Sequence, residues 1–191
     1  MKPIQLTATI AASVLLAACA STSDTASTST APAASAPTST ASSARVNLAS
    51  ASGSLVSGTL TVTPMGDGVH VAGEVGGLAP GSTHAFHIHE KGDCSAADAS
   101  SAGGHFNPTA NPHGKAKAGP HHAGDADNLV ADTQGVAKVD AHFGGVTLGG
   151  SAANDVAGKA VIVHASPDDY KSQPAGNAGA RVACGLITVV Q

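Results

Sequence analysis

The stretch Ala85-Phe86-His87-Ile88-His89-Glu90 places histidines at alternate positions, which is typical of a β-strand whose two faces differ. Side chains repeat every two residues along a strand, so His87 and His89 are predicted to lie on one face. Neutral imidazole is the commonest side-chain ligand for copper and zinc, so these two histidines form half of a candidate metal site. The chain has ten histidines, and all of them lie between His70 and His164.

Further runs along the chain alternate in the same way and are separated by turn residues. The clearest are 55–63 and 69–75, which are joined by Met65-Gly66-Asp67-Gly68, a hairpin signal. Strands are also predicted over these ranges: 83–89, 135–143, 159–164 and 181–190, with short ones over 46–51 and 128–132. No stretch keeps a helical period, so the sequence predicts an all-β sandwich or barrel.

The N-terminal residues predict an exported and tethered protein. Residues 1–18 contain Lys2 and an apolar run too short to span a bilayer, as in a signal peptide. They end in Leu16-Ala17-Ala18-Cys19, which resembles a bacterial lipoprotein processing site and implies a lipid on Cys19. An ordinary signal peptide cut nearby is the alternative. Residues 19–44 are almost entirely Ser, Thr, Ala and Pro, so we expect a flexible tether there.

The remaining residues, 45–191, have the length of one folded domain. The whole chain carries a net charge of −4 at pH 7, and loss of the signal peptide removes the positive charge of Lys2. This balance argues against nucleic acid as a partner. With Cys19 assigned to the lipid, Cys94 and Cys184 remain as a pair, and we expect a disulfide between them in an oxidising compartment.

The segment 90–127 has little strand pattern, and a long loop inside a compact domain is usually functional. It contains four histidines and a nearby aspartate: His105, His113, His121, His122 and Asp125. Three histidines and an aspartate can supply the four ligands of a zinc site, and the metal would then organise the loop. The alternatives are solvated histidines or a loosely metal-binding segment. The strand pair and His164 favour a defined site instead.

These motifs together resemble the copper/zinc superoxide dismutase family. The resemblance rests on residues 85–93, Gly104-His105-Phe106-Asn107-Pro108, His122-Ala123-Gly124-Asp125, Val163-His164-Ala165 and residues 176–185. It covers nearly all of residues 45–191, in family order. It implies a Greek-key β-sandwich or barrel of about eight antiparallel strands with a long metal-binding loop. It also implies one copper ion and one zinc ion per subunit, with superoxide anion as the substrate.

The resemblance also implies which residues bind each metal. Copper would be bound by His87, His89, His105 and His164, and zinc by His105, His113, His122 and Asp125. His105 would therefore serve both metals. The neighbouring His121 would be a bystander, because the His-Ala-Gly-Asp spacing favours His122. Asp168 would bond the outer nitrogens of His87 and His113, whereas an exposed turn acid is the alternative interpretation.

The reaction that the resemblance implies converts two superoxide ions and two protons into dioxygen and hydrogen peroxide by copper redox cycling. Two residues would take part in it directly. Arg181 would attract and orient the anion, whereas a solvated surface arginine is the alternative interpretation. His105 would release copper during the cycle and take up a proton. The rival functions are a copper carrier or store on the same fold, and a surface domain that only sequesters metal. Filled ligand positions and Arg181 disfavour both.

Taken together, these features predict a lipid-anchored enzyme of the bacterial periplasm or cell envelope, which protects the envelope from superoxide. Ala20 after Cys19 favours the outer membrane, by analogy with bacterial lipoproteins. A monomer and a homodimer are both compatible with the strand pattern. His70, His84 and His142 match no ligand position, so we expect structural or surface roles for them.

Overall fold

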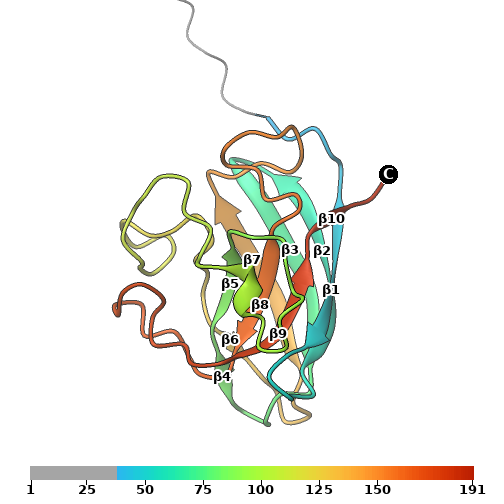
Figure 1. Cartoon of the computed structure of the whole chain (residues 1–191), viewed down its shortest axis with the longest axis vertical. Helices are drawn as coiled ribbons and strands as arrows, with labels where there is room; N and C mark the ends of the chain where they lie inside the picture. The colour runs from blue at the N-terminus through green and yellow to red at the C-terminus, as the bar shows by residue number, and fades with distance from the viewer. Residues whose placement is uncertain (1–37) are drawn as a thin grey trace, which may run out of the picture. The chain divides into compact units, whose positions relative to one another are not determined.

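The chain folds into a curled antiparallel β-sheet in the computed structural model, which describes residues 38–191 (Figure 1). The strand order is β5-β8-β9-β1-β2-β3-β7, and β10 also pairs with β1. The bounds are β1 Ala44–Ser50, β2 Ser57–Met65, β3 Gly68–Gly76, β5 Phe86–His89, β7 Ala137–Gly144, β8 Ala160–His164, β9 Arg181–Leu186 and β10 Thr188–Val189. A two-stranded sheet pairs β4 (Thr83–His84) with β6 (Leu129–Val130).

The connections give this sheet the form of a closed Greek-key barrel. Strands β1, β2 and β3 are consecutive neighbours, after which the chain crosses to β5 at the far edge and returns to β7 beside β3. A bridge between Ala131 and Ala137 links the end of β6 to β7, and β4 runs almost directly into β5. The small sheet therefore joins the two edges of the large one. The predicted all-β fold with about eight antiparallel strands is confirmed.

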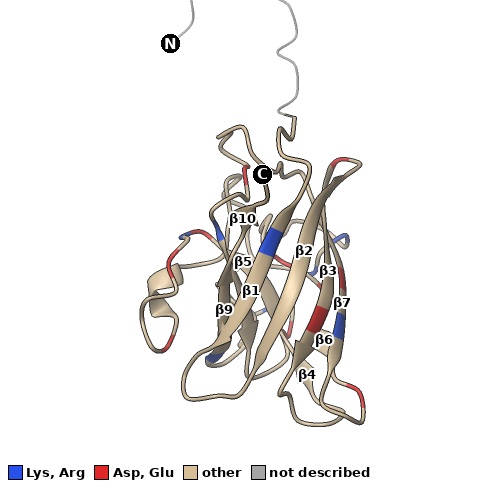
Figure 2. Ribbon diagram, turned by 90° about the vertical axis from the view of Figure 1, so that its right-hand side faces the viewer, with Lys and Arg blue, Asp and Glu red and all other residues tan. Residues whose placement is uncertain are grey.

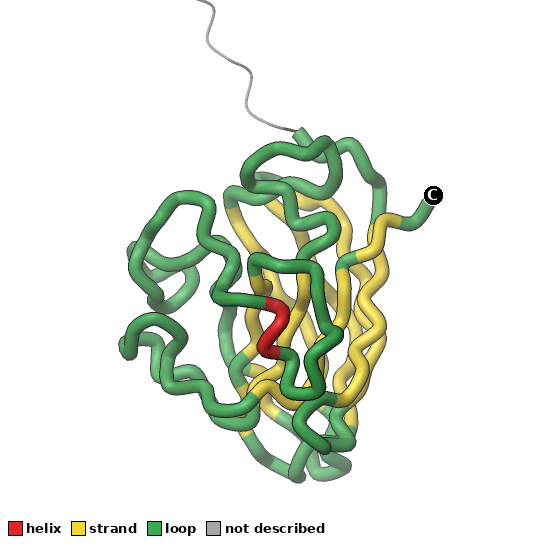
Figure 3. Tube along the Cα trace, viewed as in Figure 1, coloured by secondary structure: helices red, strands yellow, loops and turns green. Residues whose placement is uncertain are grey.

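Regular helix is almost absent from the described part of the chain. Its only helical element is a single 3-10 turn at Ser100–Ala102, within the long loop (Figure 3). Between residues 38 and 191 we find no helix long and apolar enough to cross a membrane.

Two predicted strands are interrupted by residues that pair outside the ladder. In the run 83–89, the Ala85 amide donates to the Ser166 carbonyl (2.9 Å), and the Ala85 carbonyl accepts from the His164 amide (2.9 Å). In the run 181–190, the Ile187 amide donates to the Lys159 carbonyl (2.9 Å). Ile187 is also buried and lies between β9 and β10, which pair with opposite ends of β1.

Strand β5 contributes side chains both to the apolar core and to the predicted metal ligands. Phe86 and Ile88 are fully buried in the main apolar cluster, where the Phe86 ring lies 6.2 Å from the ring of Phe143. His87 and His89 alternate with them and are just as buried. His105, in the long loop, covers both, because its ring centroid lies 4.0 Å from that of His87 and 5.0 Å from that of His89.

The folded domain begins before residue 45, the predicted boundary. The amides of Thr40 and Ala41 both donate to the Leu148 carbonyl at 3.0 Å, and the Leu148 amide donates to Ser39 Oγ at 2.9 Å. Residues 39–44 therefore pack against the domain, although composition placed them in the tether. The predicted signal peptide, Cys19 and the tether up to residue 37 lie outside the described residues.

Candidate metal centre

Three backbone hydrogen bonds bring the histidine-bearing segments together beside β5. The Ile88 amide donates to the Gly124 carbonyl (2.9 Å), the Gly124 amide to the Phe106 carbonyl (2.8 Å), and the Phe106 amide to the Ile88 carbonyl (2.8 Å). Each of these residues is adjacent in sequence to a predicted metal ligand. A Cβ at Gly124 would overlap the Ile88 carbonyl oxygen, so only glycine permits this approach.

One group of four buried histidines gathers its ring nitrogens within 4.8 Å of one another: His87, His89, His105 and His164. The buried Nδ1 of His87 and the buried Nε2 atoms of the other three have no hydrogen-bond partner. Buried polar groups are normally hydrogen-bonded, so four unpaired nitrogens in one place require an explanation. A set of free imidazole lone pairs is what a copper ion needs.

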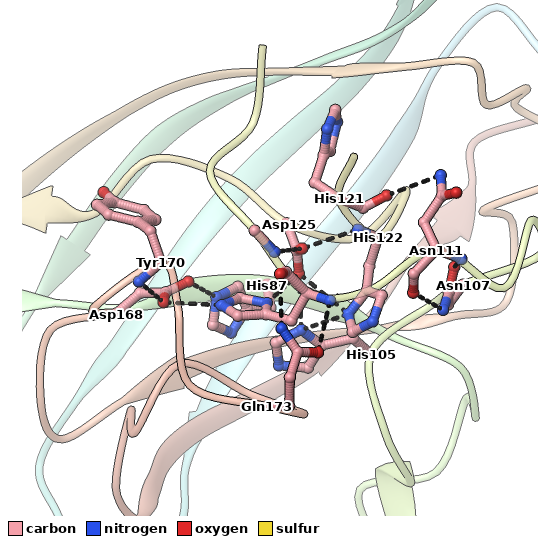
Figure 4. Close-up of polar contacts among 12 residues, drawn as sticks. His87, His105, Asn107, Asn111, His121, His122, Asp125, Asp168, Tyr170 and Gln173 are labelled. Atoms are coloured by element: carbon pink, nitrogen blue, oxygen red, sulfur yellow. Dashed lines mark hydrogen bonds and ion pairs between the residues drawn. The ribbon is translucent and has the colours of Figure 1, made fainter. Parts of the chain in front are cut away.

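A second group has the spacing of a tetrahedral site and contains His105, His113, His122 and Asp125. Asp125 Oδ1 lies 2.7 Å from His105 Nδ1, 3.0 Å from His113 Nδ1 and 3.4 Å from His122 Nδ1 (Figure 4). Tetrahedral zinc with bonds of about 2.0–2.1 Å holds its donors roughly 3.3 Å apart. His105 contributes Nδ1 to this group and leaves Nε2 for the first, so its imidazole is common to both.

Three of the ring nitrogens that face away from the two groups have acceptors of their own. Asp168 accepts from His87 Nε2 through Oδ2 and from His113 Nε2 through Oδ1, each at 2.9 Å. The Gly103 carbonyl accepts from His89 Nδ1 at 2.9 Å. Donation of the outer N–H fixes the tautomer and leaves the inner nitrogen as a lone-pair donor.

Burial keeps the imidazoles of His87, His89 and His164 neutral. Desolvation lowers the pKa of His87 to about 4, that of His89 to about 2 and that of His164 to about 3. In the second group, burial opposes the charge on His113, but the carboxylates of Asp125 and Asp168 outweigh it and raise the His113 pKa to about 9. The cluster therefore combines neutral donors on one side with a concentration of negative charge on the other.

A pocket of about 390 Å³ opens onto the first group, and His89, His105, His164, Pro174, Ala175 and Arg181 are part of its lining. Arg181 is the only permanently charged residue in that lining as the structure describes it. Its Nη1 donates to the Ala99 carbonyl (2.7 Å) and its Nη2 to the Gly103 carbonyl (2.6 Å). In Figure 2 the lysines and arginines are spread along several strands and loops and do not gather at one place. A larger cavity, of about 510 Å³, contains none of these residues.

The predicted disulfide is present and supports this pocket. Cys94 in the long loop is bonded to Cys184 in β9, with 5.8 Å between their Cα atoms. Cys184 lies three residues after Arg181 on the same strand. The loop that supplies the Ala99 and Gly103 carbonyls is therefore covalently attached to the strand that carries the guanidinium.

Comparison with known proteins identifies the family. A family model for copper/zinc superoxide dismutase matches residues 56–187. The chain belongs to the copper/zinc superoxide dismutase family. Superoxide dismutase [Cu-Zn] 2 of Aquifex aeolicus is 42% identical over 135 residues, which cover 69% of this chain and 79% of the relative. The Caulobacter vibrioides superoxide dismutase [Cu-Zn] is 43% identical over 136 residues, which cover 69% and 78%.

Solved structures agree with this assignment. A crystal structure of a SOD-like protein from Bacillus subtilis is 36% identical in sequence and superimposes with a TM-score of 0.68. The match covers 75% of this chain and 97% of that chain. The residues present here fit the two metals of the family, because four imidazoles suit copper and three imidazoles with a carboxylate suit zinc.

The other histidines lie outside both groups in the described structure. His121, beside His122 in sequence, is turned away, with its Nδ1 2.7 Å from the Gly119 carbonyl oxygen (Figure 4). His70 and His142 bond surface carboxylates at 2.7 and 2.9 Å. His84 has a structural contact with the site, because its Nδ1 lies 2.7 Å from the carbonyl oxygen of the ligand candidate His164.

Several residues that hold this site in place were missed by the sequence reasoning. Asn128 uses its side-chain amide to bond both main-chain groups of Asp168, at 2.8 and 3.0 Å. The Gly103 carbonyl accepts from both His89 and Arg181. Gly176 has a φ of +65° and packs directly against Asp168. None of these roles follows from a periodic pattern, because the contacts join residues in different loops or strands, with Asn128 and Asp168 40 positions apart and Gly103 and Arg181 78 apart.

The close approach at Gly176 generates a test of Asp168. In Gly176→Ala, the new Cβ would overlap Asp168 Oδ1 and lie 2.7 Å from His113 Nε2, so the carboxylate must move. We expect zinc affinity, measured by competition with a chelator, to fall about 10- to 100-fold, as for other partners of metal ligands. Gly81→Ala is the control, because Gly81 has a φ of +73° but no atom within 4 Å of its Cβ position. Equal zinc affinity in both variants would contradict the assigned contact.

Proposed function

We infer that this protein is a superoxide dismutase that converts two superoxide ions and two protons into dioxygen and hydrogen peroxide. The observation that carries the inference is the imidazole of His105, whose two nitrogens belong to two different donor groups. A storage or sequestering protein has no need of a shared ligand beside an anion-accessible pocket. Family membership and the named relatives support the same reaction.

The chain's own residues divide the work between binding the anion, holding the ligands and supplying a proton. When bound, copper supplies one-electron redox chemistry, and zinc supplies a redox-inert positive charge. Arg181 binds and orients the small anion, because its guanidinium is held in the pocket lining. Asp168 keeps His87 and His113 in orientation. His105 Nε2, buried at the end of the pocket, is the atom at which a proton is held and passed to the reduced product.

We also propose that the enzyme acts in the cell envelope, attached by a lipid on Cys19, and removes superoxide formed outside the cytoplasm. The support is the run Leu16-Ala17-Ala18-Cys19, in residues that the structure does not describe, and the Cys94–Cys184 disulfide. Structural disulfides persist mainly in oxidising compartments, which include the bacterial periplasm.

The shared ligand gives the first test of function. His105→Gln should lose superoxide consumption by at least about 100-fold and retain less than one copper per chain, because it removes a donor from both groups. His142→Gln is the matched control, since His142 bonds only Asp67 at the surface. The metal-loaded wild type should contain one copper and one zinc by elemental analysis. An inert protein with both metals bound would reject the enzyme in favour of a metal store.

The role of Arg181 predicts a dependence on ionic strength. Arg181→Ala should lower kcat/KM roughly tenfold or more and flatten its decrease with added salt, because screening acts on the attraction between arginine and anion. Arg45→Ala removes the same charge from an exposed site on β1 and is the control. If the two variants show the same salt profile, Arg181 does not guide the substrate.

The lipid anchor is tested with the full-length chain expressed in bacteria. Wild type should enter the detergent phase on phase separation, and Cys19→Ser should move to the aqueous phase because it has no thiol to acylate. Ser21→Ala should behave as wild type. A wild-type protein recovered in the aqueous phase would exclude the anchor while leaving the enzymatic inference unchanged.

A further inference from the structure

The side chain of Gln173 bonds both main-chain groups of His113. The His113 amide donates to Gln173 Oε1 at 2.8 Å, and Gln173 Nε2 donates to the His113 carbonyl at 2.8 Å. The two residues are 60 positions apart in sequence. Gln173 Nε2 also donates to the Lys171 carbonyl at 3.3 Å, which ties the amide to its own loop. The carboxamide thus bonds the main-chain amide and carbonyl of His113, as a neighbouring strand bonds those of a residue in a sheet.

This support matters because His113 has no regular structure around it. It lies in the long loop between β5 and β6, and its side chain is buried between the carboxylates of Asp125 and Asp168. Those carboxylates fix the direction of the ring, and Asp125 Oδ2 also accepts from the Gly114 amide at 3.1 Å, but the amide and carbonyl of His113 itself are bonded by Gln173. A ligand on a free loop loses part of its binding energy to ordering, and the Gln173 pair holds it in advance.

The residues that follow Gln173 form part of the pocket. Pro174 and Ala175 line the 390 Å³ cavity together with Arg181. Gly176 then packs on Asp168, which holds His87 and His113. One short segment therefore bonds the main chain of a zinc-side ligand, forms the wall on the copper side and supports the carboxylate between them.

We propose that Gln173 is a positioning residue that fastens His113 to the wall of the anion pocket, so that zinc affinity and anion access depend on one carboxamide. The proposal rests on the proposed function for the identity of the two metals and of the anion. It assigns no chemical step to Gln173, which bonds the main chain of His113 and not its donor nitrogen. Its effect is to hold His113 and residues 174–175 in one arrangement.

The test uses the full chain loaded with copper and zinc and compares three variants. Gln173→Met keeps the length of the side chain and removes both the donor and the acceptor. Gln173→Glu keeps an acceptor for the His113 amide but faces the His113 carbonyl with a second oxygen. Gln134→Met is the matched control, because Gln134 is an exposed glutamine in the turn before β7. Gln173 is itself exposed, so these substitutions leave the core intact.

Three readouts are independent of turnover: zinc affinity by chelator competition, hydrogen exchange of the His113 amide, and azide binding to the copper site by optical titration. In Gln173→Met we expect zinc to bind about tenfold more weakly. Exchange should be roughly threefold faster or more, and azide binding should weaken by a similar factor. In Gln173→Glu, His113 exchange should stay closer to wild type, because the acceptor is kept.

Zinc affinity and His113 exchange within twofold of wild type in Gln173→Met would overturn the proposal. Equal effects in Gln134→Met would also overturn it. Weaker zinc binding with unchanged azide affinity would refute the link to the pocket wall. A wild type that binds no zinc would instead refute the proposed function, so the two failures are distinguishable.

Discussion

The carboxylate of Asp168 is the contact on which the geometry of the whole centre depends. Its two oxygens bond the outer nitrogens of His87 and His113, one from each donor group, at 2.9 Å. The side chain of Asp168 is fully buried. Burial by itself raises the pKa of this carboxyl, but the hydrogen bonds from His113 and His87 lower the pKa by more, so it lies below its usual range. A carboxylate held charged in the interior must be fully paired, and the Tyr170 amide supplies a third donor, to Oδ1 at 2.7 Å.

The second constraint is the alternation of β5, which gives one strand two tasks. Phe86 and Ile88 complete the apolar interior, while His87 and His89 project to the outer side, where loops bury them. Because the core fixes the position of the strand, it also fixes the two histidines, and the backbone contacts of Ile88 with the loops bring the other ligands to them. Rigidity of the site is therefore a consequence of ordinary core packing.

The sequence alone predicted those strands and site residues that follow a short periodic pattern or a compact motif. Alternation located the strands, and the histidine motifs indicated the candidates that the structure gathers into two groups. It failed at Ala85 and Ile187, where it predicted unbroken strands, because both residues bond the main chain at or just beyond the ends of β8. It also placed residues 39–44 in the tether, since composition cannot register the hydrogen bonds of Ser39, Thr40 and Ala41 to Leu148. Gln173 was missed for the same reason: a single amide carries no periodic signal.

The loop that contains Gly103 bonds residues of the metal site and also carries one cysteine of the disulfide. The Gly103 carbonyl accepts from His89 on the copper side and from Arg181 in the pocket, so the positions of ligand and guanidinium cannot change independently. The same loop is attached to β9 by Cys94–Cys184, which closes a sequence separation of 90 residues. A crosslink over so long a loop restricts the unfolded chain strongly, by about 4–5 kcal/mol in the chain-entropy model. The disulfide therefore makes the arrangement of His89 and Arg181 most secure where thiols are oxidised, which is where the proposed export would deliver the protein.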